Sequence, residues 1–340
     1  MRKVGLSLLI LLIVMVGLIG RSETAEPSKT TWRLGHYFPT TDLRGILAQQ
    51  FADLITKKTN GRIEVKVYPN SQLVKGAEVF RALSANVHQI SLIPAGYVTG
   101  EIPVAEFWSL PFSPWQDFET VNRIVNVTFD IWSAEYARNN AKYLGQGCSS
   151  ISAANLYAKT PIRKVSDLAG KKMRSSGRSV DTAFRAVKAS PVNMAASEQY
   201  MALQTGTIDG VVTGPGSVTS YKLYEVAPYW SEIPFVMPPY SWAVNLEEWN
   251  KLTPELQQIV LDAKKEMDQT TAAAEKIEKK EEEHEIAAKV KERIQWPNSE
   301  VNLWRTQIQS LYADFFKKHG KNGSTLEKLW EDGTKGIWPK

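Results

Sequence analysis

Cysteine is almost absent from this chain of 340 residues, because Cys148 is the only one. A lone thiol cannot form an internal disulfide, so the fold must be stabilised by a packed core, which a chain of this length can build. We interpret Cys148 as a small buried apolar side chain, and a nucleophilic thiol is the alternative interpretation.

Recognisable catalytic and metal-binding motifs are also missing. The four histidines, His36, His88, His284 and His319, do not have the spacing of a metal site. No G-x-S-x-G motif occurs, and no glycine-rich loop precedes a helix in the nucleotide-binding pattern. We therefore expect no cofactor, no metal and no enzymatic activity, although a catalytic site assembled from distant residues stays open as an alternative.

A dense cluster of one charge is missing as well. The chain has 41 lysines and arginines against 36 aspartates and glutamates, which gives a formal net charge of +5. The basic residues are spread along the chain, so there is no case for nucleic-acid binding. The mild positive charge weakly favours encounter with anionic ligands.

Only the N-terminus contains a long apolar run. Residues 6–19 are apolar apart from Ser7, Arg2 and Lys3 precede them, and Ser22 and Ala25 are small residues at candidate cleavage positions. This pattern predicts a secretory signal peptide over residues 1–25, with an uncleaved signal anchor as the alternative. The run is shorter than the roughly 20 residues that a spanning helix needs, so we expect a soluble mature protein in the periplasm.

The first part of the chain alternates strand and helix patterns. Residues 31–35 read as a strand, a helix follows with Leu47, Phe51 and Ile55 on one face, and residues 63–67 alternate as the next strand. The same rhythm restarts after residue 160. These patterns predict an α/β protein with two lobes.

The C-terminal part predicts one long helix. Thr253 supplies an N-cap hydroxyl, and Pro254 and Glu255 follow in the first turn. No breaker occurs before Ile294, so this helix would reach about 60 Å at 1.5 Å per residue, which exceeds one lobe. We expect its charged stretch, residues 275–293, to form a solvated face.

Arg174 stands where a predicted strand ends and a predicted helix begins. Residues 171–173 have strand character, and a turn at 175–177 leads into a helical pattern that contains Val180 and Phe184. Ligands of α/β proteins bind at such boundaries. A guanidinium offers a planar fork that matches a carboxylate, and the N–H groups of the following helix add donors. An anionic ligand is therefore expected, and a surface ion pair is the alternative.

A series of short motifs extends over nearly the whole chain after its N-terminal segment. The motifs are Gly35-His-Tyr, Gly61 to Leu73, Ser109-Leu-Pro-Phe112, Asp167 to Arg174, Ser197 to Gly206, Asp209-Gly210 and Tyr224-Glu-Val226. In this order and spacing they resemble the DctP-type extracytoplasmic solute receptors of TRAP transporters. The resemblance implies a two-lobed periplasmic binding protein fold with a long C-terminal helix along both lobes. We assign residues 26–152 and 240–279 to lobe I, and residues 153–239 and 280–340 to lobe II.

The resemblance also implies a set of ligand-binding positions. The family's principal carboxylate-binding arginine corresponds to Arg174. A second arginine of several members corresponds to Ala154, a frequent asparagine to Thr213, and a frequent aromatic residue to Ala196. Loss of a cation at Ala154 and of a ring at Ala196 favours a ligand with a single carboxylate and a larger, more apolar body.

Aromatic residues are expected at the edges of the cleft. These are Phe38, Tyr97, Tyr240 and Trp242, whose rings would stack on a ring of the ligand. Ordinary core packing is the alternative for each of them. The acids in the matched motifs, Glu198, Asp209 and Glu225, are expected to be caps or interlobe hydrogen-bond acceptors.

Together these observations predict a monomeric periplasmic receptor for an organic acid, with an aromatic or apolar monocarboxylate as the expected ligand. The resemblance implies that a TRAP permease in the membrane, driven by an ion gradient, is the partner. Two alternatives stay open: a periplasmic enzyme that acts on organic acids, and a ligand-presenting partner of a sensor kinase.

Overall fold

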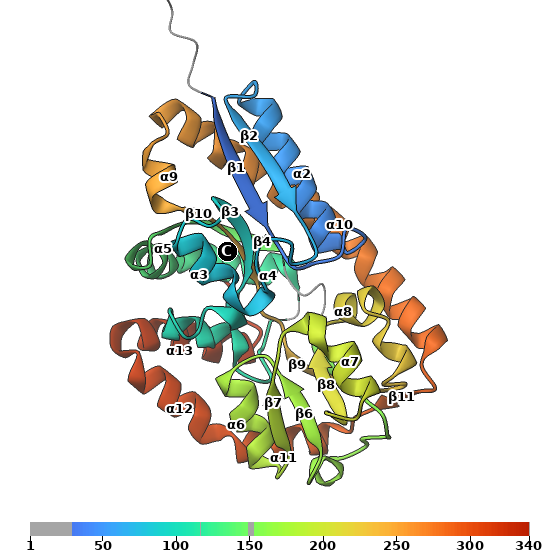
Figure 1. The fold of residues 1–340 in the computed structure, drawn as a ribbon. Coiled ribbons are helices and arrows are strands. Elements are labelled where there is room, and N and C mark those ends of the chain that lie inside the picture. The colour runs from blue at the N-terminus through green and yellow to red at the C-terminus, as the bar shows by residue number, and fades with distance from the viewer. Residues whose placement is uncertain (1–28, 116, 149–152, 340) are drawn as a thin grey trace, which may run out of the picture.

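The computed structural model describes residues 29–115, 117–148 and 153–339. The predicted signal peptide lies outside the described residues. Within them the chain forms two α/β lobes, one above the other in Figure 1, each with its own sheet. The predicted fold class is confirmed.

Lobe I contains a mixed sheet. Its strands are β1 (Thr30–Gly35), β2 (Ile63–Tyr68), β3 (Ile90–Pro94), β4 (Ala141–Cys148) and β10 (Tyr240–Asn245). Their order is β2-β1-β3-β10-β4, and β10 runs antiparallel to both neighbours because it enters from the other lobe. The helices of this lobe are α2 (Leu43–Lys58), α3 (Val79–Ser84), α4 (Phe118–Val127), α5 (Phe129–Arg138) and α9 (Leu246–Asn250).

Helix α2 illustrates why the local sequence folds as it does. Asp42 is its N-cap, and its carboxylate accepts from the backbone N–H of Arg44 at 2.9 Å. Leu47, Phe51 and Ile55 recur at helical spacing and are buried, as predicted.

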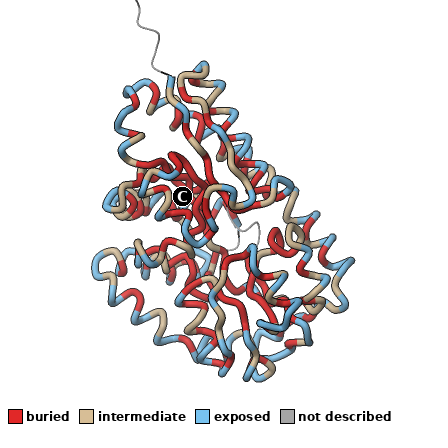
Figure 2. Tube along the Cα trace, in the orientation of Figure 1, coloured by how far each residue is buried: buried red, intermediate tan, exposed pale blue. Residues whose placement is uncertain are grey.

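Lobe II contains the second sheet. Its strands are β5 (Ala154–Ala158), β6 (Lys172–Ser175), β7 (Ser190–Asn193), β8 (Gly210–Thr213), β9 (Tyr229–Val236) and β11 (Glu292–Gln295). They are ordered β11-β9-β5-β8-β6-β7, and β5 is antiparallel to β8 and β9. Its helices are α6 (Arg178–Ala186), α7 (Gln199–Gln204), α8 (Pro215–Ser220) and α11 (Asn298–Gln307). Buried residues follow the strands of both sheets (Figure 2).

The predicted long helix is α10 (Pro254–Lys289), which has 36 residues and a length of about 54 Å. Thr253 caps it and accepts from the N–H of Leu256 at 3.3 Å. It packs against α2 of lobe I and α8 of lobe II, so it joins the two lobes (Figure 1). It ends before Ile294, because β11 pairs with β9 there.

The expectation of a wholly solvated face over residues 275–293 is wrong for two acids. Glu275 and Glu282 are buried where α10 crosses the lobes. Exposed residues surround them, and His284 is exposed as expected. No helix in the described part of the chain is long and apolar enough to cross a membrane.

The last two helices, α12 (Gln309–Lys318) and α13 (Gly320–Thr334), return to lobe I. Phe315 and Trp330 belong to an aromatic cluster with Phe107 and Trp115 of that lobe. The assignment of the whole range 280–340 to lobe II therefore differs from the structure. Phe315, Phe316 and Trp330 are buried by packing in the tryptophan-rich cluster of lobe I, while Tyr312 also packs against the core cluster of lobe II.

Candidate ligand-binding site between the lobes

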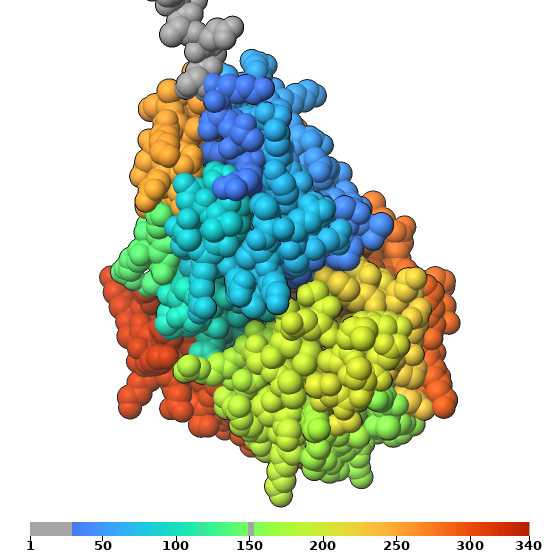
Figure 3. Space-filling model, viewed as in Figure 1, coloured from blue at the N-terminus to red at the C-terminus, as the bar shows by residue number. Residues whose placement is uncertain are grey.

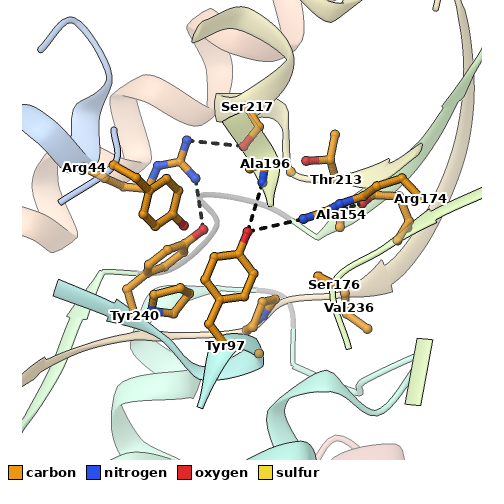
Figure 4. Close-up of a pocket in the computed structure, with 16 residues that line it drawn as sticks. Arg44, Tyr97, Ala154, Arg174, Ser176, Ala196, Thr213, Ser217, Val236 and Tyr240 are labelled. Carbon is orange, nitrogen blue, oxygen red and sulfur yellow. Dashed lines mark hydrogen bonds between the residues drawn. The ribbon is translucent and has the colours of Figure 1, made fainter. Parts of the chain in front are cut away.

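A cavity of about 60 Å³ lies between the two lobes, which are packed against each other across it (Figure 3). Since a buried water needs about 10–15 Å³ on this measure, the cavity has room for roughly four to six waters. Its walls come from both lobes, with Tyr97 and Tyr240 on one side and Arg174 and Thr213 on the other (Figure 4). The cavity is polar where these side chains lie.

Arg174 lies near the end of β6, as the sequence predicts, and is 3 % exposed. Its Nε donates to the carbonyl of Met194 at 3.0 Å, and its Nη1 donates to the carbonyl of Val212 at 3.1 Å. The remaining nitrogen, Nη2, points to the hydroxyl of Tyr97 at 3.4 Å. All these partners are neutral, so the positive charge is held rigidly at the cavity wall without a carboxylate among its hydrogen-bond partners in the described part of the chain.

Helix α6 begins close to this guanidinium. Ser176 lines the cavity, Gly177 is the N-cap, and no side chain of the described residues caps the helix. The positive end of the α6 dipole therefore adds to the charge of Arg174 at this wall. Both features favour an anion.

Tyr97 connects the lobes. It ends the short 3₁₀ helix Ala95–Tyr97 that follows β3 in lobe I. Its hydroxyl accepts from the backbone N–H of Ala196 at 3.0 Å, in addition to its contact with Arg174. Ala196 and Arg174 both belong to lobe II, so this phenol bridges the cleft (Figure 4).

A second guanidinium, that of Arg44, also lines the cavity, and sequence reasoning missed it. Arg44 is 3 % exposed, and its Nη1 donates to the hydroxyl of Tyr240 at 3.0 Å. Burial alone would lower its pKa, but Asp42 and the phenol of Tyr240 raise that pKa well above the ordinary value, so Arg44 stays charged. The only feature of the sequence that could have indicated Arg44 is its position in the first turn of a capped helix, and arginines at such positions are usually solvated.

The other predicted positions that line the cavity come mainly from lobe II. Ala154 and Ala196 are small and buried, so together with Val212 and Val236 they form its apolar part. Thr213 lies at the end of β8, with its hydroxyl 3.5 Å from the side-chain amide of Gln199.

Phe38 and Trp242 do not line this cavity, which differs from the expected placement. Phe38 is fully buried, and the guanidinium of Arg44 lies 4.6 Å from its ring centroid. Trp242 packs against Phe51 in the core of lobe I, with ring centroids 4.6 Å apart. Phe38 supports the cavity wall from behind through its contact with Arg44. Tyr240 stands between Phe38 and the cavity, with its ring centroid 5.6 Å from that of Phe38.

The three acids of the matched motifs serve as hydrogen-bond acceptors within lobe II. Glu198 accepts from the N–H of Ala195 at 3.1 Å, and Asp209 accepts from the N–H of Lys172 at 2.8 Å. Glu225 accepts from the hydroxyl of Tyr200. None of the three lines the cavity in the described structure.

Two α/β lobes, a long helix that joins them and a buried arginine in the cleft between them define a two-lobed solute-binding protein. The chain belongs to the bacterial extracellular solute-binding proteins of family 7, the DctP family, whose model matches residues 34–319. The family consists of solute-binding receptors rather than enzymes.

One curated relative and two solved structures of similar fold illustrate the match. The C4-dicarboxylate-binding periplasmic protein DctP of Rhodobacter capsulatus is 29% identical over 260 residues, which cover 75% of this chain and 76% of that protein. A Bordetella pertussis extracytoplasmic solute receptor that binds pyroglutamic acid has a TM-score of 0.81 at 22% identity, with 88% and 99% of the two chains covered. A TRAP periplasmic solute-binding protein from Xanthobacter autotrophicus Py2 with bound β-D-galacturonate has a TM-score of 0.80 at 24% identity, with 87% and 99% covered.

Proposed function

We propose that this chain is a periplasmic receptor that binds an organic acid with one carboxylate in the interlobe cavity and delivers it to a TRAP permease in the membrane. The observation that carries the proposal is Arg174, a buried guanidinium at the cavity wall whose hydrogen-bond partners in the described structure are neutral. A ligand carboxylate would complete the hydrogen bonding of this group and neutralise its charge.

The relatives support the ligand class. Those proteins bind a C4-dicarboxylate, pyroglutamic acid and β-D-galacturonate, and each of these ligands carries at least one carboxylate. The body of the ligand meets a mixed surface here, with Ala154, Ala196 and Val236 on the apolar side and Ser217 and Thr213 on the polar side.

The size of the cavity limits the body of the ligand. A volume of about 60 Å³ fits a compact acid better than the aromatic acid favoured by the sequence. An acid with an aromatic ring would require the lobes to close less far than they do in this structure. We therefore propose a compact monocarboxylate, with an aromatic monocarboxylate as the larger limit.

Binding would favour the closed arrangement of the lobes, because Arg174 of lobe II and Tyr97 of lobe I line the cavity from opposite sides and would both contact the ligand. A ligand shifts this equilibrium only by its differential affinity for the closed form. The permease would then recognise the closed receptor, which we propose acts as a monomer without a cofactor.

The enzyme alternative lacks support in the cavity. Among its described lining residues the nucleophilic side chains are hydroxyls, such as Ser176 and Ser217, and no histidine or carboxylate lies among them. Cys148 is buried, and burial raises the pKa of its thiol well above the ordinary value. The sensor alternative has the same binding site and differs only in the partner.

A thermal-shift screen tests the proposal. The panel contains compact monocarboxylates such as pyroglutamate and lactate, aromatic acids such as phenylpyruvate, and the neutral amide of each acid. Acids that bind should raise the melting temperature, by mass action, while their amides should not. A panel in which amides stabilise as well as their acids would contradict carboxylate recognition.

A further inference from the structure

The second arginine of the cavity is held in a complete ion pair. Asp42 accepts from Nε of Arg44 at 2.7 Å through Oδ1 and from Nη2 at 2.5 Å through Oδ2. Both side chains are almost fully buried, 4% exposed for Arg44 and 1% for Asp42. Such a bidentate pair inside a protein is strong, because water does not compete for either partner.

The rest of the Arg44 guanidinium is also engaged. Its Nη1 donates to Tyr240, and its Nη2 lies 3.4 Å from the hydroxyl of Ser217 in lobe II. Asp42 in turn accepts from the hydroxyl of Ser220, also in lobe II, at 2.8 Å. Arg44 therefore lines the cavity but offers few free donors to a ligand, because Asp42 behind it occupies its guanidinium.

The charges around the cavity can be counted from these contacts. Arg174 and Arg44 contribute two positive charges and Asp42 one negative charge, so one positive charge remains. Behind the pair, burial raises the pKa of Glu282 on α10 to about 8, so this acid is mostly uncharged at neutral pH. Glu278 on the same helix lies near the pair and is only partly buried, and burial raises its pKa as well.

We propose that Asp42 is a positioning residue that occupies and neutralises Arg44 and thereby restricts the site to ligands with a single carboxylate. A second carboxylate on the ligand would have to displace Asp42 or remain without a cationic partner inside the cleft, and both cost free energy. This inference rests on the proposed function, because it assumes that Arg174 holds the first carboxylate.

Asp42 allows a clean substitution. It is the N-cap of α2, and asparagine caps helices as well as aspartate does. Asp42→Asn therefore preserves the shape of the side chain and the cap to the N–H of Arg44, while it removes the negative charge and one acceptor of the fork. Asp117→Asn is the matched control, since Asp117 caps α4 by accepting from the N–H of Thr120 at 2.7 Å and does not line the cavity.

The experiment compares succinamate with succinate, which have nearly the same shape but one and two carboxylates. Calorimetry on the wild type should show tighter binding of succinamate. In Asp42→Asn the ratio of the two affinities should move toward succinate by about tenfold or more. A change of this size corresponds to the net free energy of one charge-assisted hydrogen bond. A role of Asp42 in the fold alone would weaken both ligands equally and leave the ratio unchanged.

The outcomes separate this inference from the proposed function. Three results would overturn the role of Asp42. The wild type could bind succinate as tightly as succinamate, it could bind neither of them, or the Asp42→Asn variant could show an unchanged ratio of the two affinities. An Asp117→Asn variant that shifts the ratio equally would overturn it too. None of these results bears on the proposed role of Arg174. If that role were wrong, acids and their neutral amides would stabilise the protein equally in the thermal-shift screen.

Discussion

The hydroxyl of Tyr97 should control how tightly the lobes close on a ligand. Tyr97→Phe removes one oxygen that joins the lobes through the N–H of Ala196 at 3.0 Å and the guanidinium of Arg174 at 3.4 Å. The neutral hydrogen bond from Ala196 contributes a net stabilisation of roughly 0.5–1.5 kcal/mol, and the contact from the charged guanidinium, which is long at 3.4 Å, contributes about the same or less. The closed form should therefore lose about 1–2 kcal/mol.

That loss should appear in affinity. Because both bonds cross the cleft, they stabilise the closed form and not the individual lobes. A ligand that binds the closed form should bind about 5–30-fold more weakly to Tyr97→Phe, as measured by titration calorimetry with the best acid of the thermal-shift screen. The aromatic ring stays in place, so its packing is unchanged.

A matched control uses another phenol that lies away from the cavity. Tyr312 donates to the carbonyl of Pro111 at 2.9 Å, and Tyr312→Phe should leave ligand affinity at the wild-type value. The reasoning is refuted if Tyr97→Phe binds the ligand as tightly as the wild type. Equal weakening by both variants would refute it as well, because the effect would then not come from the cleft.

Three further results are expected. Burial lowers the pKa of His36 and His88 from 6.5 to about 4, so both side chains are neutral in the folded protein at neutral pH. The free energy of unfolding, measured in urea, should therefore be fully retained above pH 6.5 and fall between pH 6.5 and 4 by up to about 3 kcal/mol per histidine. A flat pH profile would contradict this. Because burial raises the pKa of the Cys148 thiol, Ellman's reagent should react with it only in denaturant, and rapid reaction of the native protein would show that it is exposed. Saturating ligand should lower the radius of gyration in small-angle scattering without a change in far-ultraviolet circular dichroism, and identical scattering curves would exclude closure.

The sequence predicted the features that depend on local pattern. The strands and helices of lobe I follow from short periodic segments, and the start of α10 follows from the hydroxyl of Thr253 and the proline after it. Arg174 was predicted for the same reason, because a strand, a turn and a helix succeed one another within a few residues. Family motifs then supported the same position.

Features that depend on distant contacts could not be predicted in this way. Arg44 reaches the cavity only because Asp42 holds it and α8, some 170 residues later, packs across the cleft. Phe38 was expected at the cleft because it follows the first strand, and Trp242 because it lies near the crossover back to lobe I. However, β10 is buried along its whole length, so an alternation of polar and apolar residues along its sequence cannot show which face of the strand is turned toward a ligand. The apolar faces of α12 and α13 are evident in the sequence, but the lobe that they cover is not.

The central claim is that Arg174 holds the carboxylate of the ligand, and titration calorimetry of Arg174→Ala tests it most directly. Arg178→Ala is the control, because Arg178 is exposed and lies only four positions away on α6. Loss of Arg174 leaves the ligand carboxylate without its partner and should cost roughly 2–5 kcal/mol, so that binding heat nearly disappears, while Arg178→Ala binds like the wild type. Wild-type affinity in Arg174→Ala would contradict the account.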